Sequence, residues 1–258
     1  MTDAGLRPPL KWAGGKRWLL PELQKRWKPH ASRRLVEPFC GGLAVALGLQ
    51  PKQALLNDIN PALINFYQQL QRGLTMTIAM ANDESLYYQH RQSFNNQSLT
   101  DADRAQLFYY LNRTGYNGLC RFNKSGAYNV PFGRYKTIYY QTDFSAYSPV
   151  LSDWQFTQLD FEALTTRPTD FIYADPPYDV PFRQYAQQGF DWQDQERLAL
   201  WLSKHPGPVV LSNQATDRIC RLYRQLGFRL RYLQAPRRIS CKTASRKTVK
   251  EVLAVRGF

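Results

Sequence analysis

The fold is decided by the stretch VEPFCGGLAV, residues 36–45. The apolar residues at its start are typical of a short buried strand that ends at Glu37, and the glycine pair that follows opens an apolar, helical run. The same order then recurs, because the apolar residues 54–56 end just before Asp58 and Pro61 opens a second helical run. The sequence therefore predicts strand, helix, strand and helix in succession.

Strand and helix signals also alternate in the second half of the chain. An apolar run at residues 171–174 precedes the turn DPPY, residues 193–202 have a helical pattern, and residues 209–211 form another apolar run. Strands that alternate with helices predict an α/β fold, with a mostly parallel sheet and helices on both of its faces. Ligands of such sheets bind at the carboxyl ends of the strands, so functional residues are expected there.

Composition indicates a folded protein with a polyanionic partner. The chain has 258 residues, and its 34 lysines and arginines exceed its 20 aspartates and glutamates, which gives a net charge of +14. Hydrophobic residues make up 43% and aromatic residues 14%, whereas disordered chains are poor in both. The positive field attracts phosphate polymers, but it does not by itself identify a fold or a reaction.

Other sequence classes are not expected. The longest apolar runs, such as residues 43–49, are far shorter than the roughly 18 to 20 residues of a membrane-spanning helix, so no membrane association is predicted. Because the N-terminal residues lack the apolar core of a signal peptide, we expect a cytoplasmic protein. The cysteines lack any C-x-x-C pairing, so neither a disulfide framework nor a metal site is predicted; they are Cys40, Cys120, Cys220 and Cys241.

Aromatic and basic residues alternate in the middle of the chain, between residues 108 and 147. Planar rings beside cations suit a surface that stacks on bases or wedges between them while neutralising phosphates, although a small aromatic core has the same composition. Within this region, GAY at residues 126–128 is expected to form the bend of a β-hairpin that joins RFNK, residues 121–124, to NVPF, residues 129–132.

A second basic stretch lies near the C-terminus. No acidic residue occurs between Asp217 and Glu251, and many arginines and lysines alternate there with aliphatic residues. This pattern predicts folded structure with one cationic side. The polar residues 236–248 are expected to form a basic loop between two strands, and we interpret residues 237–247 as a clamp on a nucleic-acid backbone.

Two acidic residues at strand ends indicate a nucleoside-containing cofactor. Glu37 lies at the first strand end, and Asp58 follows about 20 residues later at the second, where a carboxylate can accept hydrogen bonds from two ribose hydroxyls. The dinucleotide fingerprint G-x-G-x-x-G is absent, and WAGGKR at residues 12–17 lacks the spacing of a P-loop. A glycine pair and one aspartate also occur in purely structural turns, so this signal is weak without a further motif.

The strongest motif is DPPY, which consists of Asp175, Pro176, Pro177 and Tyr178. Two consecutive prolines fix an extended turn and remove two N–H donors, so their carbonyl oxygens are left to accept hydrogen bonds. The Asp175 carboxylate adds further acceptors, and Tyr178 supplies a ring for stacking. Such a site suits an exocyclic –NH2 group, whose two hydrogens are held while the attached ring stacks.

These motifs together resemble the DNA adenine N6-methyltransferases of the Dam and DpnM type, the D12 class. The resemblance rests on LKWAGGK (10–16), VEPFCGG (36–42), NDIN (57–60), LNRTGYNGLCRFNKSGAYNVPFGRYK (111–136), DPPY (175–178) and VLSN (210–213). It implies a Rossmann-like class I methyltransferase domain, residues 1–70 and 148–258, with an inserted helical and β-hairpin target-recognition domain, residues 71–147. The long middle motif distinguishes this branch from other amino-methyltransferases.

The resemblance also implies S-adenosylmethionine as the cofactor. Residues of the first motif would line its methionine side, and residues 37–41 would form the strand end at the cofactor. Asp58 would bind its ribose, and the QLDF segment would bind its adenine. The implied residues are Trp12, Ala13, Gly14, Lys16, Glu37, Pro38, Phe39, Cys40, Gly41, Asp58, Asp160 and Phe161. One position departs from the family pattern, because Leu43 stands where a second glycine is common, and this puts a close approach of backbone and cofactor there in question.

Relatives of this type commonly read GATC in duplex DNA, so the partner implied is double-stranded DNA. Arg121 would contact a guanine, because a guanidinium matches O6 and N7 in the major groove. Leu119 and Pro131 would lie near the thymine methyl, and Tyr135 would wedge into the vacated stack. Lys11, Asn117 and Arg134 would help to fix the site, and Arg113 and Lys124 would contact phosphates. The adenine would have to rotate out of the duplex to reach the enzyme.

Two alternatives remain open at this point. Cytosine N4 methylation would use a similar site, although its motif more often begins with serine than with Asp175. A DNA-binding protein without catalysis would retain the hairpin but would not need Asp58, Asp175 and Tyr178. Monomer is the default expectation, and a cognate restriction endonuclease that acts separately is possible from sequence, as is an enzyme that acts alone.

Overall fold

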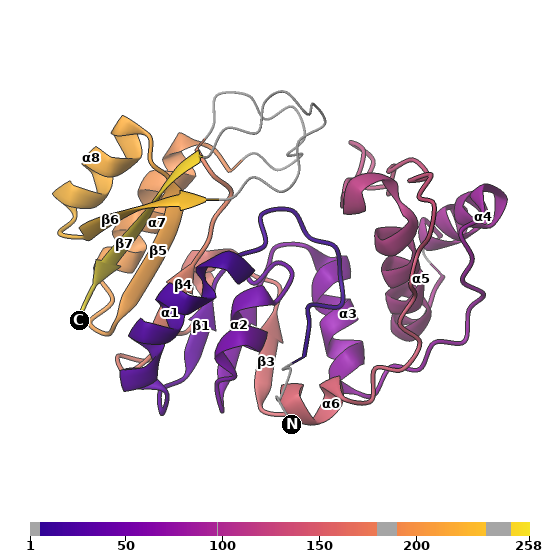
Figure 1. Ribbon diagram of the computed structural model, residues 1–258, viewed down its shortest axis with the longest axis horizontal. Coiled ribbons are helices and arrows are strands. Elements are labelled where there is room, and N and C mark those ends of the chain that lie inside the picture. Colours follow the sequence, from indigo (N-terminus) through magenta and orange to yellow (C-terminus); the bar gives the residue numbers. More distant parts are fainter. Residues whose placement is uncertain (1–5, 97, 180–189, 236–248) are drawn as a thin grey trace.

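A seven-stranded sheet forms the centre of the part of the chain that the structure describes (Figure 1). The structure is a computed structural model, and it describes residues 6–96, 98–179, 190–235 and 249–258. The strand order is β3-β2-β1-β4-β5-β7-β6, with β7 antiparallel to both neighbours and the other pairs parallel. The predicted Rossmann-like α/β fold is confirmed.

The strands have the following bounds: β1 Leu35–Glu37, β2 Ala54–Asn57, β3 Trp154–Thr157, β4 Phe171–Ala174, β5 Val209–Gln214, β6 Arg229–Ala235 and β7 Val249–Arg256. The helices are α1 Leu20–Trp27, α2 Ala44–Leu49, α3 Pro61–Gln71, α4 Glu84–Phe94, α5 Asp101–Thr114, α6 Tyr147–Leu151, α7 Trp192–Ser203 and α8 Asp217–Gln225. Single 3-10 turns are η1 Arg17–Leu19, η2 Lys28–His30, η3 Tyr116–Gly118 and η4 Phe161–Ala163.

Helices cover both faces of the sheet because successive strand residues point to opposite sides. Leu35 and Tyr173 pack into the core that includes α1, α2 and α3. Their neighbours Val36 and Ile172 pack into a second core, to which α7 and α8 contribute. The strands therefore read as continuous apolar runs rather than alternating ones, as expected for a parallel sheet buried on both faces.

Helix α3 begins where the sequence signals predict. The Asn60 side chain accepts hydrogen bonds from the backbone N–H groups of Ala62 and Leu63, and Pro61 occupies the first turn. An Asn cap followed by proline satisfies free N–H groups and fixes the entry of the chain. Because α3 starts directly after β2, the cap also fixes the loop that carries Asp58.

The middle region packs against the sheet domain through α3. Helices α4 and α5 lie on the right of Figure 1, beyond α3. The ring of Phe66 on α3 stacks on Tyr109 of α5, with centroids 6.0 Å apart, and Phe144 closes the cluster. One hydrophobic core therefore continues from the sheet into this region. The division into domains at residues 70/71 and 147/148 stays a prediction.

The expected hairpin is present, but its bend lies earlier than GAY. The turn spans residues 123–126, where the Gly126 N–H donates to the Asn123 carbonyl and Gly126 has a φ of +81°. Tyr128 already pairs with Phe122 across the hairpin. The prediction placed the bend too late, because Asn123 also accepts the N–H groups of Ser125 and Ala127 and so forms the turn.

The remaining expectations concern the C-terminal stretch, the membrane and the cysteines. Strands β6 and β7 flank residues 236–248, as predicted for the basic loop, but the loop itself lies outside the described residues. Among the described residues, no helix is both long enough and apolar enough to cross a bilayer. Cys40, Cys120 and Cys220 are free thiols, and Cys241 is outside the described part.

Candidate active site

The carboxyl ends of β1, β2 and β4 surround a cavity of about 910 Å³. Every residue that the sequence predicts for cofactor binding or catalysis lines it: Trp12, Ala13, Gly14, Lys16, Glu37, Pro38, Phe39, Cys40, Gly41, Asp58, Asp160, Phe161, Asp175, Pro176, Pro177 and Tyr178. The parallel register brings these residues together, because Glu37 ends β1 while Asp58 and Asp175 directly follow the neighbouring strands β2 and β4. The cavity thus lies where an α/β sheet is expected to bind a ligand.

The glycine pair after β1 accommodates Trp12. A Cβ atom on Gly41 would lie 2.9 Å from the Trp12 indole nitrogen, and one on Gly42 would lie 2.8 Å from the Trp12 Cβ. Both distances are too short for real side chains, so the glycines allow the N-terminal segment to pack on the turn. Leu43 has a φ of 59° and thus keeps the left-handed conformation that glycine favours.

Asp58 links the first two strand ends. One carboxylate oxygen accepts the Gly41 N–H at 3.1 Å, and the other accepts the Asn60 N–H at 3.1 Å. Burial raises the pKa of Asp58, and the two backbone hydrogen bonds oppose the rise. The carboxylate is held at the cavity wall, and each oxygen retains a lone pair for a ligand hydroxyl.

Lys16 forms an ion pair with Asp175, and the sequence did not predict this pair. The Lys16 ammonium lies 3.1 Å from the Asp175 carboxylate and donates to the Gly14 carbonyl at 3.0 Å. Ser212 donates to the other Asp175 oxygen at 2.8 Å. Burial raises the pKa of Asp175, whereas Lys16 and Ser212 favour its ionised form. The carboxylate is therefore fixed by two donors.

Glu37 is the most deeply buried acid at the cavity wall. It is 2% exposed, and its Oε1 atom has no hydrogen-bond partner among the described residues. Burial raises the pKa of Glu37 well above its ordinary value, and the neighbouring Asp175 carboxylate adds to the rise. An unpartnered buried carboxyl oxygen is costly unless a ligand supplies a donor or a positive charge.

The Tyr178 side chain is held at its ring and at its hydroxyl group. The hydroxyl donates to the Glu251 carboxylate at 2.7 Å, and the Lys16 ammonium lies 4.5 Å from the ring centroid. Glu251 lies on β7, and burial raises the pKa of this carboxyl. Sequence reasoning missed Glu251, although an acid at the start of the apolar run EVLAV is a usable signal for a buried polar role.

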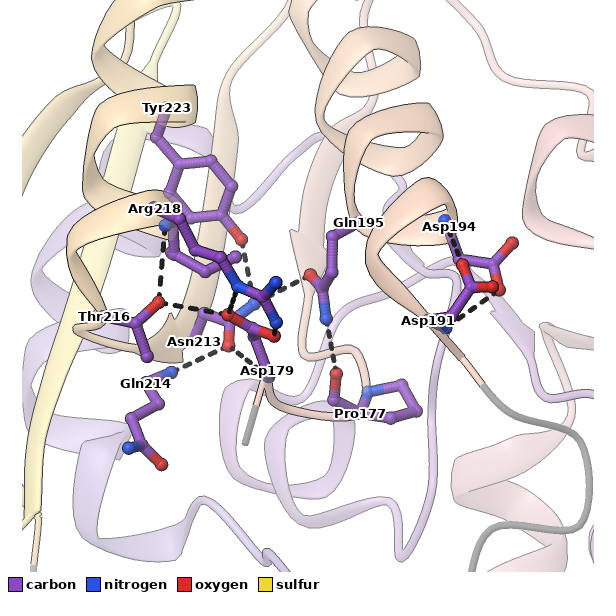
Figure 2. A network of polar contacts seen from close by, with 11 residues as sticks. Pro177, Asp179, Asp191, Asp194, Gln195, Asn213, Gln214, Thr216, Arg218 and Tyr223 are labelled. Atoms are coloured by element: carbon purple, nitrogen blue, oxygen red, sulfur yellow. Dashed lines mark hydrogen bonds and ion pairs between the residues drawn. The ribbon is translucent and has the colours of Figure 1, made fainter. Parts of the chain in front are cut away.

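The DPPY turn is also held from outside the cavity. Gln195 on α7 donates to the Pro177 carbonyl at 2.7 Å, and Asn213 at the end of β5 accepts the Asp179 N–H at 3.2 Å (Figure 2). Asn213 belongs to the motif VLSN, but no role was predicted for it or for Gln195. The Asn213 amide donates to the Gln195 side-chain oxygen at 2.9 Å.

The opposite side of the cavity carries the QLDF segment. Asp160 accepts the Glu162 N–H at 3.0 Å and an Arg197 guanidinium N–H at 3.0 Å. The Phe161 ring is buried, with the Arg197 guanidinium 4.9 Å from its centroid. Phe161 thus offers a fixed apolar wall.

The predicted DNA-binding residues lie mostly beside this cavity rather than in it. Only Leu119 of that set lines the cavity. The Lys11 ammonium lies 3.7 Å from the Tyr135 ring centroid and donates to the Arg113 carbonyl at 2.8 Å. Burial lowers the pKa of Lys11 to about 8, and the Arg113 charge contributes. The Tyr135 hydroxyl donates to the Gly115 carbonyl at 3.0 Å.

Arg121 is oriented across the hairpin. Its Nε donates to the Asn129 side-chain oxygen at 2.7 Å, and its Nη2 donates to the Asn129 carbonyl at 3.0 Å. The remaining guanidinium N–H groups can reach a ligand. Four further predicted DNA-binding residues of this region have exposed side chains: Asn117, Lys124, Pro131 and Arg134.

Arg113 and Tyr135, the predicted phosphate contact and the predicted wedge, are both partly enclosed by neighbouring residues. Arg113 is only partly exposed, its Nη2 donates to the Tyr139 carbonyl at 3.0 Å, and its Nε is buried without a partner among the described residues. Tyr116 is 42% exposed, whereas the predicted wedge, Tyr135, is covered by Lys11. The aromatic pattern of residues 108–147 assigns no separate role to Tyr116 and does not distinguish this exposed ring from the buried ones.

Comparison with known proteins agrees with these motifs. The family described as D12 class N6 adenine-specific DNA methyltransferase matches residues 12–239. The chain is 38% identical to the retron Ec67 DNA adenine methylase of Escherichia coli, over 96% of this chain and 90% of the relative. It is 38% identical to a DNA adenine methylase of Vibrio cholerae serotype O1 and 35% identical to that of Escherichia coli K12, each over 95% of this chain and 94% of the relative.

The match to the family covers most of the chain, including the motifs at the cavity and the hairpin. The relatives are matched over nearly their whole length. The chain therefore belongs to the D12 class of N6 adenine-specific DNA methyltransferases.

Proposed function

We propose that this enzyme transfers a methyl group from S-adenosylmethionine to N6 of an adenine that rotates out of a GATC duplex site. One observation carries the proposal: the predicted cofactor-binding and catalytic residues line a single cavity. Among the residues that the structure describes, five acidic residues and one cationic residue, Lys16, line the cavity, although the whole chain has a charge of +14. This local excess of negative charge favours a cationic ligand over a phosphate-rich one.

The residues at the cavity fit S-adenosylmethionine. The unpartnered Glu37 oxygen can accept a hydrogen bond from an amino group, and a bound cation would oppose the rise in the Glu37 pKa. Asp58 would accept from the ribose hydroxyls, and Asp160 and Phe161 would hold the adenine. When bound, S-adenosylmethionine would supply a methyl group on a sulfonium, which is already activated for transfer.

The protein's part in the transfer is to hold and align N6. The Asp175 carboxylate and the Pro176 carbonyl would accept the two N6 hydrogens, which favours a pyramidal nitrogen with an available lone pair. The same acceptors would stabilise the positive charge that develops on N6. Gln195 already occupies the Pro177 carbonyl, which supports Pro176 as the second acceptor. No strong base is needed, because the methylated product loses its proton readily.

Tyr178 would stack on the adenine after it leaves the duplex. Its ring lies at the cavity, and its hydroxyl is fixed by Glu251. Stacking partly offsets the few kcal/mol that base rotation costs. On the DNA side, the hairpin would enter the major groove, with Arg121 aimed at a guanine and Leu119 and Pro131 near the thymine. Tyr135 would wedge at the vacated position, and Lys11, Arg113, Asn117, Lys124 and Arg134 would fix the backbone and the site.

The family sets aside both alternatives left by the sequence. Its description is adenine-specific, so cytosine N4 methylation is not supported, and it is a family of enzymes rather than of binding proteins. A monomer, a cytoplasmic location and a separate restriction endonuclease stay predictions. The basic residues 237–247 remain a proposed clamp on the DNA backbone, and they lie outside the described residues.

The product identifies the reaction directly. A GATC duplex incubated with the enzyme and methyl-labelled S-adenosylmethionine is expected to carry label at adenine N6, measured by nucleoside digestion and chromatography. The control duplex carries the fully paired site AATT in place of GATC, and it should be labelled far more slowly. Label at cytosine, or equal labelling of both duplexes, would contradict the proposed base or the proposed site, respectively.

Arg121→Ala is expected to weaken discrimination at one guanine by about 1 to 3 kcal/mol, since a bidentate contact to O6 and N7 would be lost. The measurement compares kcat/KM for GATC with kcat/KM for duplexes altered at each position. Lys124→Ala is the matched control from the same hairpin, because loss of a phosphate contact lowers affinity for every sequence and reduces the salt dependence. A uniform loss in Arg121→Ala would assign Arg121 to phosphate binding instead.

A further inference from the structure

The two peptide groups that flank Tyr178 are both held by side chains. On one side, the Pro177 carbonyl accepts a hydrogen bond from the Gln195 amide at 2.7 Å. On the other, the Asp179 N–H donates to the Asn213 side-chain oxygen at 3.2 Å. These side chains come from α7 and β5, far from the turn in sequence, and Figure 2 shows them converging on it.

Gln195 and Asn213 form a buried bridge. Gln195 is 1% exposed and Asn213 is fully buried, and the Asn213 amide donates to the Gln195 side-chain oxygen at 2.9 Å. Asn213 also donates to the Tyr223 hydroxyl at 3.0 Å and accepts the Gln214 N–H at 2.8 Å. Such a satisfied network has one favoured arrangement, because any shift leaves a buried polar group without a partner.

The bridge is anchored further by Asp179. Its carboxylate accepts hydrogen bonds from Thr216 at 3.1 Å and from the Arg218 Nε at 2.6 Å, and the Arg218 guanidinium lies 4.5 Å from the Trp192 ring centroid. The turn is therefore tied to the first residues of both α7 and α8. None of these contacts needs a ligand, so the backbone on both sides of Tyr178 is set before substrate arrives.

We propose that Gln195 and Asn213 are positioning residues for methyl transfer, which fix the Tyr178 backbone so that the ring stacks on the target adenine with N6 at Asp175 and Pro176. An amide suits this task at any pH, because each side chain must donate on one side and accept on the other. The inference rests on the proposed stacking role of Tyr178. In this inference the bridge aligns the adenine N6 for the reaction, and it does not contribute to the affinity for cofactor or DNA.

Gln195→Met tests the bridge while keeping side-chain volume. The single-turnover rate at saturating S-adenosylmethionine and GATC duplex is expected to fall about 10- to 100-fold, as for a small misplacement of reacting groups. The dissociation constants for both ligands should stay near those of the wild type. An unchanged rate, or a loss that appears only as weaker binding, would overturn the proposal.

Gln106→Met is the matched control. Gln106 is a buried helical glutamine, 4% exposed, whose side-chain oxygen accepts the Thr77 N–H at 2.6 Å and the Ile78 N–H at 3.2 Å. The same substitution therefore removes a comparable helix-to-loop contact that lies away from the cavity. Its single-turnover rate should match the wild type even where its stability falls. An equal rate loss in the two variants would show a general effect of stability and would overturn the proposal.

A double variant separates this inference from the proposed function. If Gln195 acts through Tyr178, then Gln195→Met should cost little further rate in a Tyr178→Ala background, so the two losses should not add. Additive losses would overturn the inference. An unchanged rate in Tyr178→Ala alone would overturn the role of Tyr178 and this inference with it, whereas a slow Tyr178→Ala beside a wild-type Gln195→Met overturns the inference only.

Gln195→Glu gives an independent signature and carries the test if the methionine variant does not fold. A glutamate carboxylate cannot donate to the Pro177 carbonyl, but its protonated form can, and burial raises the pKa of a carboxyl at such a site. The rate of this variant relative to the wild type should therefore rise as pH falls. A ratio that does not change with pH would contradict the need for a donor at this position.

Discussion

Asp175→Ala is expected to reduce methyl transfer by a factor of at least about 10²–10³, since it removes a preorganised acceptor at the atom where positive charge develops. Duplex binding should remain close to wild type, because the recognition hairpin lies beside the cavity and not in it. The measurement is the single-turnover rate at saturating ligands, beside the dissociation constant for GATC duplex.

The alanine variant also leaves the buried Lys16 ammonium without its partner, so a second substitution is needed. Asp175→Asn keeps one acceptor oxygen and can keep the hydrogen bond with Ser212, and its rate should fall less than that of the alanine variant. Circular dichroism should show that both variants fold. Wild-type turnover in folded Asp175→Ala would show that Asp175 is not the acceptor.

Arg34→Ala is expected to lower the free energy of unfolding by about 3–5 kcal/mol, because it leaves a buried carboxylate unpaired. Arg34 donates to Asp170 at 3.0 and 2.7 Å, and these side chains are 8% and 0% exposed, respectively. They directly precede β1 and β4, the two central strands that carry Glu37 and Asp175 at their opposite ends. Urea unfolding measures the loss.

Arg33→Ala is the control for this substitution. Arg33 makes one exposed hydrogen bond, to the Thr169 carbonyl at 2.9 Å, and its removal should cost under about 1 kcal/mol. Below the unfolding transition, both variants should transfer methyl groups at the wild-type rate, because neither side chain lies at the cavity. An equal stability in the two variants would contradict the importance of the buried pair.

The sequence predicts the central part of the fold well because its strands are short apolar runs that end at polar motifs: Glu37, Asn57 with Asp58, DPPY, and Ser212 with Asn213. Each of β1, β2, β4 and β5 is found where such a run occurs. Strand β3 was not predicted, since WQFT at residues 154–157 alternates buried and exposed residues at the sheet edge. The QLDF segment that follows it was identified only through the family resemblance and did not mark a strand end. The antiparallel insertion of β7 between β5 and β6 is a tertiary choice that local pattern does not encode.

The wall of the candidate site was predictable for the same reason. Strand ends converge in a parallel sheet, so motifs that lie far apart in sequence meet at one cavity. The contacts that fix those residues were not predictable: the ion pair of Lys16, the acceptor Glu251 and the donor Gln195 depend on how separate elements pack. The acid at the start of the apolar run EVLAV was a signal for Glu251, but it does not identify the hydrogen-bond partner, and the sequence around Lys16 and Gln195 is polar.

Leu43 explains how the chain tolerates its departure from the family pattern. A left-handed conformation costs a residue other than glycine roughly 1–2 kcal/mol. The Leu43 side chain is fully buried in the core, and burial of a leucine contributes about 1.5–3 kcal/mol. Packing therefore offsets the backbone cost, and the turn keeps the left-handed conformation that glycine favours.

The shared core between α3 and α5 limits how far the proposed recognition region, residues 71–147, can be exchanged between enzymes. Phe66, Tyr109 and Phe144 pack together across the predicted domain boundary, so a graft cut at residues 71 and 147 would separate rings that now shield one another. If the hairpin around Arg121 reads the target as proposed, we expect new specificity to be engineered more readily at its exposed tip than by transplanting the whole segment. Substitutions at the exposed hairpin tip should therefore leave the core shared by α3 and α5 intact, whereas exchange of the whole segment would not.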